Sequence, residues 1–157
     1  MIGKPAGILQ KPGQGLSYWL LGDLYTYKIV GQDTNQAYAL CEIIMKPQSE
    51  VPPHIHSHEA EAFYIQEGEM EFQLGEKIIV ATPGTFLHSP QGELHRFKNI
   101  GSKPAKFLSW VTPAGFENFI REAGVPASEI EDKIPEVTSE DIEKVMATAS
   151  KYGIKII

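Results

Sequence analysis

The chain has 157 residues, 42% of them hydrophobic and 22% charged, which suits one compact domain with a sizeable core. Its 14 Lys and Arg against 20 Asp and Glu give a formal net charge of -6. Because this charge repels nucleic-acid phosphates and anionic lipid headgroups, we expect neither nucleic acid nor a membrane as a partner.

Three further features favour a cytoplasmic protein. The apolar runs are too short for a helix that spans a membrane, and the first residues lack the apolar segment of a signal peptide. The single cysteine, Cys41, has no partner for an internal disulfide, which fits a reducing compartment. We expect Cys41 to be a small buried side chain on a strand.

Short β-rich runs fill the chain from Leu16 to Thr112, separated by Gly, Pro, Asn and Asp. Many short strands with turn signals between them predict an all-β barrel or sandwich. Alternation places Met70, Phe72 and Leu74 on one side of their strand, which should face inward. The predicted strands are 16–21, 24–30, 37–45, 60–66, 69–74, 77–81, 85–89, 95–100 and 105–111.

Two Pro-containing segments predict turns between these strands. In Thr82-Pro83-Gly84-Thr85, Pro fixes the φ of the first central position and Gly takes the positive φ of a type II turn. Ser89-Pro90-Gln91-Gly92 predicts a type I turn before the next strand.

The pattern changes from strand to helix near Pro113. Residues 114–123 predict a short helix with Phe116, Phe119 and Ile120 on one side and Gly124 as its stop. We therefore divide the chain into a β-barrel at 1–113 and a helical extension at 114–157 that packs on the same domain.

A second helix is predicted from Ser139 to Tyr152, with Gly153 as its end. Thr138 and Asp141 resemble a capping box, with Asp in place of the usual Glu or Gln. Packing onto the barrel or a partner subunit is expected for the apolar stripe of Ile142, Val145, Met146 and Ala149.

Three of the five histidines have a spacing that strand geometry explains. His54 and His56 alternate along an extended strand, so both imidazoles project from the same face. Glu61 begins an apolar strand face, where a carboxylate is costly unless it is paired, and a metal ion is the obvious partner. His95 begins another alternating strand with Phe97 on its face, so it too should point inward.

These residues lie within two longer motifs. Residues 54–68 read H-x-H-x4-E-x6-G, and residues 84–99 read G-x5-P-x-G-x2-H-x3-N. Both resemble the signature motifs of the cupin superfamily, which implies a double-stranded β-helix, or jelly-roll barrel, with short C-terminal α-helices here. The resemblance also implies that His54, His56, Glu61 and His95 bind one metal ion. The chain departs from the family at Gln48, where the first motif often opens with glycine.

Other side chains compete for these roles. His58 forms a second pair with His56, and Glu59 is a competing carboxylate, but the motif spacing favours Glu61 and leaves His58 and Glu59 near the site without binding the ion. His88 shares the face of Phe86 and could line a pocket, although an ordinary strand histidine is the favoured interpretation.

Three imidazoles and one carboxylate leave coordination positions open, which is typical of a catalytic site. Without a thiolate ligand, Fe, Mn, Ni, Co, Cu and Zn are all acceptable divalent ions. Segments 15–42 and 112–124 are similar to single-domain quercetin 2,3-dioxygenase-like cupins, which implies cleavage of a flavonol, enol or diketone by dioxygen. That resemblance gives Glu61 the additional role of proton acceptor, and homodimers are usual for the family.

Two other interpretations stay open. One is a different metal-dependent enzyme, an isomerase or decarboxylase that uses no oxygen. The other is a ligand-binding cupin without catalytic activity.

Overall fold

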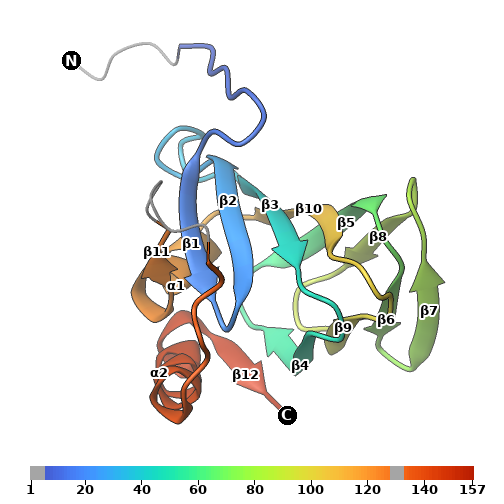
Figure 1. Ribbon diagram of the computed structural model, residues 1–157. Coiled ribbons are helices and arrows are strands. Elements are labelled where there is room, and N and C mark those ends of the chain that lie inside the picture. The colour runs from blue at the N-terminus through green and yellow to red at the C-terminus, as the bar shows by residue number, and fades with distance from the viewer. Residues whose placement is uncertain (1–5, 128–132) are drawn as a thin grey trace.

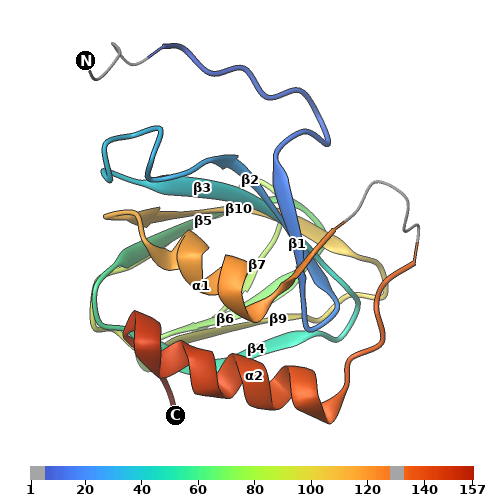
Figure 2. The same ribbon diagram turned by 90° about the vertical axis from the view of Figure 1, so that its left-hand side faces the viewer.

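Two antiparallel sheets face each other and enclose the core (Figures 1 and 2). The computed structural model describes residues 6–127 and 133–157. The larger sheet consists, in spatial order, of β11 (Val125–Pro126), β1 (Leu16–Leu20), β2 (Asp23–Ile29), β3 (Ala39–Met45), β10 (Ala105–Thr112), β5 (Ala60–Glu67) and β8 (Phe86–Ser89). The smaller consists of β12 (Ile154–Ile156), β4 (Glu50–His56), β9 (His95–Asn99), β6 (Met70–Leu74) and β7 (Lys77–Ala81). The prediction of an all-β jelly roll with short C-terminal helices is confirmed.

An aromatic cluster fills the centre of the barrel. Phe63 and Phe107 come from the larger sheet, and Phe72 and Phe97 from the smaller one. Their ring centroids lie 5.0 Å apart for Phe63 and Phe72 and 5.6 Å apart for Phe97 and Phe107. Burial of each such ring stabilises the fold by about 1.5–3 kcal/mol, so this cluster is the main link between the two sheets. The predicted inward set holds for Met70 and Phe72, which are fully buried.

One predicted turn is confirmed and the other is corrected. The Thr85 amide donates to the Thr82 carbonyl at 3.0 Å, and Gly84 has a φ of 91°, as a type II turn requires. The second turn is closed by a bond from the Glu93 amide to the Pro90 carbonyl, so it starts one residue later than expected. The φ of 82° at Gly92 excludes type I.

Strand β4 is missing from the predicted runs, although the spacing of His54 and His56 already required extended backbone there. Pro52 and Pro53 interrupt its pattern, because proline donates no backbone hydrogen bond. The pairing of β4 with β9 shifts register between Val51 and His54, where the prolines lie. Beyond this irregularity His54 pairs directly with His95.

The C-terminal extension contains strands as well as helices. Helix α1 (Phe116–Ala123) is followed by β11, and α2 (Ser139–Ala149) continues as a 3-10 turn, η1 (Ser150–Tyr152), before β12. The predicted capping box is confirmed, because the Asp141 amide donates to Thr138 Oγ1 and the Thr138 amide donates back to the Asp141 carboxylate. Gly153 ends the helical segment with a φ of 70°. The sequence pattern predicted neither β11 nor β12.

Gly124 ends α1 for a reason other than the one expected. Its φ is -85°, so no left-handed conformation is needed. A Cβ there would lie 2.7 Å from the Ile120 carbonyl oxygen and 2.9 Å from that of Trp19. The close approach of α1 to β1 therefore requires glycine at this position.

The predicted packing of the α2 stripe is only partly right. Val145 and Ala149 are buried, but Ile142 is 49% exposed and Met146 is 50% exposed. The helix contacts α1 and β12 and lies beside them at one side of the barrel (Figures 1 and 2). Among the described residues, no helix is long and apolar enough to cross a membrane.

Candidate metal centre

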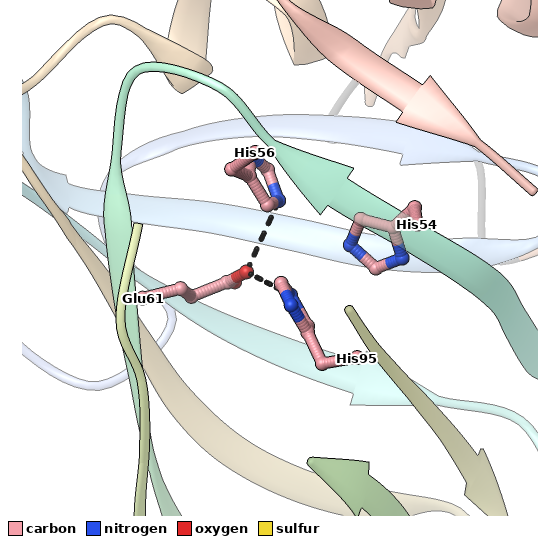
Figure 3. Close-up of side chains that lie close together, drawn as sticks. All are labelled: His54, His56, Glu61 and His95. Carbon is pink, nitrogen blue, oxygen red and sulfur yellow. Dashed lines mark hydrogen bonds and ion pairs between the residues drawn. The ribbon is translucent and has the colours of Figure 1, made fainter. Parts of the chain in front are cut away.

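Four buried side chains meet inside the barrel (Figure 3). His54 and His56 come from β4, His95 from β9 and Glu61 from β5 of the facing sheet. Each offers one ligand atom, and these atoms all lie within 4.8 Å of one another. The structure thus brings together the four residues that the two motifs single out, in a group that could hold a metal ion.

Two imidazoles point at the same carboxylate oxygen. His95 Nε2 lies 3.0 Å from Glu61 Oε2, and His56 Nε2 lies 3.3 Å from it. The ring of His54 completes the group, with its centroid 4.2 Å from that of His95. This crowding of polar groups in a buried position favours a shared cation.

Hydrogen bonds away from the centre determine which nitrogen faces it. His54 Nδ1 donates to the Pro52 carbonyl at 2.8 Å, and His95 Nδ1 lies 3.1 Å from Ser89 Oγ and 3.2 Å from the Glu93 carbonyl oxygen. A carbonyl oxygen only accepts, so Nδ1 carries a proton in His54. The Nε2 lone pair of His54 therefore remains available to a metal ion, and Nε2 of His95 faces the carboxylate of Glu61.

His56 and Glu61 are held by side chains. His56 Nδ1 lies 3.4 Å from Glu59 Oε2, and both residues are buried. Ser109 Oγ donates to Glu61 Oε1 at 2.7 Å, which leaves Oε2 directed at the imidazoles. Every member of the group thus has a partner outside it, as metal ligands in proteins commonly do.

The electrostatics of the group favour a positive charge at its centre. Burial raises the pKa of the Glu61 carboxyl, but hydrogen bonds from His56 and His95 outweigh it and hold this pKa well below its usual range. Burial lowers the pKa of His56, yet the nearby carboxylates of Glu59 and Glu61 raise it to about 9. Burial, together with the charges of His95 and His56, lowers the pKa of His54 to about 3. Glu61 is therefore an anion that attracts a cation.

The competing residues lie outside this group. His58 packs against Gly153, where an added Cβ would lie 2.4 Å from the imidazole. His88 is exposed beside Phe86 on the outer face of β8, so it does not line the interior. Glu59 contacts His56 from the side opposite Glu61, through Nδ1 instead of Nε2.

Comparison with known proteins identifies the barrel. A family model described as the cupin domain matches residues 41–111. This segment contains the four clustered residues and both motifs. Residues 41–111 form a cupin domain.

Relatives of this cupin domain carry different names. Quercetin 2,3-dioxygenase of Bacillus subtilis is 34% identical over 73 residues, which are 46% of this chain and 21% of that protein. The Xanthan biosynthesis protein XanB of Xanthomonas campestris is 29% identical over 76 residues, 48% of this chain and 16% of that protein. The chain thus spans about a fifth or less of these relatives.

A solved structure supports the fold. The predicted oxalate decarboxylase of Thermotoga maritima superposes with a TM-score of 0.61 at 21% identity, covering 68% of this chain and 99% of that one.

The cupin domain contains a cavity of about 290 Å³ that opens onto the clustered residues. His54, His56 and Glu61 form part of its wall. Most other lining side chains are apolar, among them Ile43, Val51, Phe97, Phe116, Phe119, Ile142, Met146 and Ile156. A mostly apolar cavity with a few converging polar groups is typical of a small-molecule site.

Two parts of this cavity were not expected from the sequence. The ring of Phe116 lies edge-on to His56 with a centroid distance of 5.0 Å. Ile142 and Met146 line the cavity from α2 instead of packing into the core. Their helical spacing indicated an apolar face, but gave no sign that the face borders a cavity.

Proposed function

We propose that His54, His56, Glu61 and His95 hold one divalent transition-metal ion, with which the chain cleaves an enol or 1,3-diketone by means of dioxygen. The observation that carries this proposal is the group of four ligand atoms within 4.8 Å of one another at the wall of an apolar cavity. Three imidazoles, which are neutral once they bind an ion, and one carboxylate suit any of Fe, Mn, Ni, Co, Cu and Zn and leave coordination positions for substrate.

The bound ion would supply Lewis-acid stabilisation of an enolate oxygen. Glu61 supplies the base. Its Oε1 is held by the Ser109 hydroxyl at 2.7 Å, and Oε2 is the oxygen that faces the group. A substrate hydroxyl that enters from the cavity therefore meets a carboxylate oxygen positioned to accept its proton.

The apolar wall contributes the remaining requirements. Phe116 covers one side of His56, and Phe97 and Ile43 lie in the same cavity. These side chains exclude water and favour a flat or apolar substrate over a sugar or a small polyacid. The similarity to quercetin 2,3-dioxygenase over 73 residues supports the same class of substrate.

Oxygen uptake tests this proposal directly. The purified chain is analysed for metal, stripped, reloaded with each of the six ions in turn, and supplied with quercetin or acetylacetone in an oxygen electrode. We expect about one ion per chain and oxygen consumption that requires both ion and substrate. Turnover of an enol without oxygen uptake would favour an isomerase or decarboxylase. Metal-dependent binding of the enol without turnover would favour a ligand-binding protein.

We also propose that the outer face of the larger sheet joins two copies of the chain. Tyr64 pairs with both Phe86 and Leu108 across this face, and Tyr64 and Phe86 are exposed. A contiguous apolar strip on an outer sheet face suits a symmetric sheet-to-sheet contact. Sedimentation should show a dimer that Phe86→Lys dissociates. Ile78→Lys, at an equally exposed position of the other sheet, should leave it intact.

A further inference from the structure

We infer that α2 determines substrate specificity. In this proposal Ile142 and Met146 bind the apolar tail of a ligand. The metal-chelating head of that ligand lies at the proposed metal site, which is formed by His54, His56, Glu61 and His95. The inference rests on the proposed metal site and adds the class of substrate: a chelating 1,3-dicarbonyl or enol with an extended apolar substituent.

The α2 stripe divides into two pairs of residues. Val145 and Ala149 are buried, although they too contribute to the cavity wall. Ile142 and Met146 are half-exposed, yet both line the cavity that contains His54 and His56. Their uncovered apolar surface therefore faces the place where a ligand would lie. A bound apolar group would remove that surface from water.

Aromatic side chains connect the metal group to this helix. Phe116 lies 5.0 Å from His56 between ring centroids, and Phe119 lies 5.5 Å from Phe116. Both line the same cavity as Ile142 and Met146. One cavity therefore reaches from the clustered residues to α2, with aromatic side chains in its wall.

Charged residues also line the cavity. Lys46 and Glu50 line it, and Glu50 lies at the start of the strand that carries His54. At about 3.3 Å per residue, the backbone from His54 to Glu50 spans roughly 13 Å. The cavity thus extends along β4 beyond the His54 end of the clustered residues.

The helix is fixed in place by contacts beyond its C-terminal end. Lys151 Nζ donates to both carboxylate oxygens of Glu122, at 2.8 and 2.9 Å, which ties η1 to α1. In β12, Ile154 pairs with His56 and Ile156 with His54. The strand that follows α2 is thus bonded to the strand that bears two of the proposed ligands. A wall held in this way is preorganised for binding.

The family match ends at residue 111, so α1, α2 and β12 lie outside it. The four clustered residues all lie within the match. Chemistry and selectivity are therefore assigned to different parts of the chain, and α2 can be altered without changing a ligand.

The test uses the zinc-loaded full-length chain and a series of symmetric 1,3-diketones with n-alkyl arms, starting from acetylacetone. Dissociation constants come from calorimetry. We expect affinity to rise about two- to four-fold for each methylene added, until the tail fills the cavity. In the variant Ile142→Ser/Met146→Ser this dependence should flatten, while acetylacetone affinity and zinc content stay the same.

A matched control is Ile78→Ser/Val80→Ser, which removes two exposed apolar side chains from β7, outside the cavity lining. It should retain the full dependence on tail length. Affinity that is independent of tail length in the unaltered chain, or full dependence in the α2 variant, would overturn the inference.

The design separates this inference from the reaction. Tail-dependent binding without oxygen consumption under any ion would uphold the role of α2 and refute the dioxygenase. Failure of every diketone to bind the zinc-loaded chain would refute both.

Discussion

Glu59 Oε2 lies 3.4 Å from His56 Nδ1, on the side of the imidazole away from Glu61. Both side chains are buried, and among the described residues this oxygen has no hydrogen-bond partner within normal geometry. A carboxylate in this position directs Nε2 of His56 toward the proposed ion and strengthens it as a ligand. Nδ1 of His54 and Nδ1 of His95 lie against backbone carbonyls instead, so of the three rings only His56 has a carboxylate beside its Nδ1.

We therefore predict that Glu59→Ala weakens metal binding by about 10- to 100-fold. Glu59→Gln should weaken metal binding less than Glu59→Ala, because the amide oxygen of Gln can still accept a hydrogen bond from His56 Nδ1. Competition between the protein and a chromogenic chelator for zinc measures both affinities. Glu69→Ala, at an exposed position, serves as the control and should leave the affinity unchanged. Equal affinity in all three variants would refute a role for Glu59.

Substitution of the histidines should separate the proposed ligands from the other two. His54→Ala, His56→Ala and His95→Ala each remove a nitrogen from the group, so metal content after reloading should fall strongly. His58→Ala and His88→Ala should retain about one ion per chain, because neither belongs to the group. Elemental analysis of the five variants decides the matter. Loss of metal in His58→Ala with retention in His54→Ala would contradict the assignment.

The two halves of the α2 stripe should respond differently to a charge. Val145 is buried, so Val145→Asp places an unpaired carboxylate in the core and should lower stability by several kcal/mol. Met146 is half-exposed, so Met146→Asp should lower it by less than about 1 kcal/mol. Thermal unfolding of the two variants tests this difference. An equal loss of stability in the two variants would mean that the Met146 side chain is as buried as that of Val145 when the protein is in solution.

The features that the sequence predicts correctly depend on residues close to one another in the chain. Alternation predicted most of the barrel strands, and it placed His54 and His56 on one face, because strand geometry fixes which side chains share a face. The set of four with Glu61 and His95 came from the resemblance to the cupin motifs. The capping box at Thr138 and Asp141 is local too, and it is confirmed.

Tertiary context explains the failures. Strand β12 is only three residues long, and it forms because β4 offers it an edge. The burial of Val145 but not Met146 depends on where α1 and β12 lie, which no pattern within α2 reveals. The turn after β8 shifted because the Gly92 amide bonds to the His56 carbonyl, a partner far away in the sequence.

The final prediction separates the two roles proposed for Glu61. Glu61→Gln keeps the size of the side chain and one oxygen, so three histidines should retain a substantial part of the metal. Its amide accepts a proton far less readily than a carboxylate, so turnover per bound ion should fall by about 100-fold or more if Glu61 is the base. If Glu61 acts only as a ligand, activity should fall in proportion to the missing metal, and excess ion should restore it. Oxygen consumption with quercetin, normalised to measured metal content, distinguishes the two. Ser109→Ala is the companion variant: it frees Glu61 Oε1 from its 2.7 Å hydrogen bond yet keeps the carboxylate, so its activity per ion should fall much less than that of Glu61→Gln.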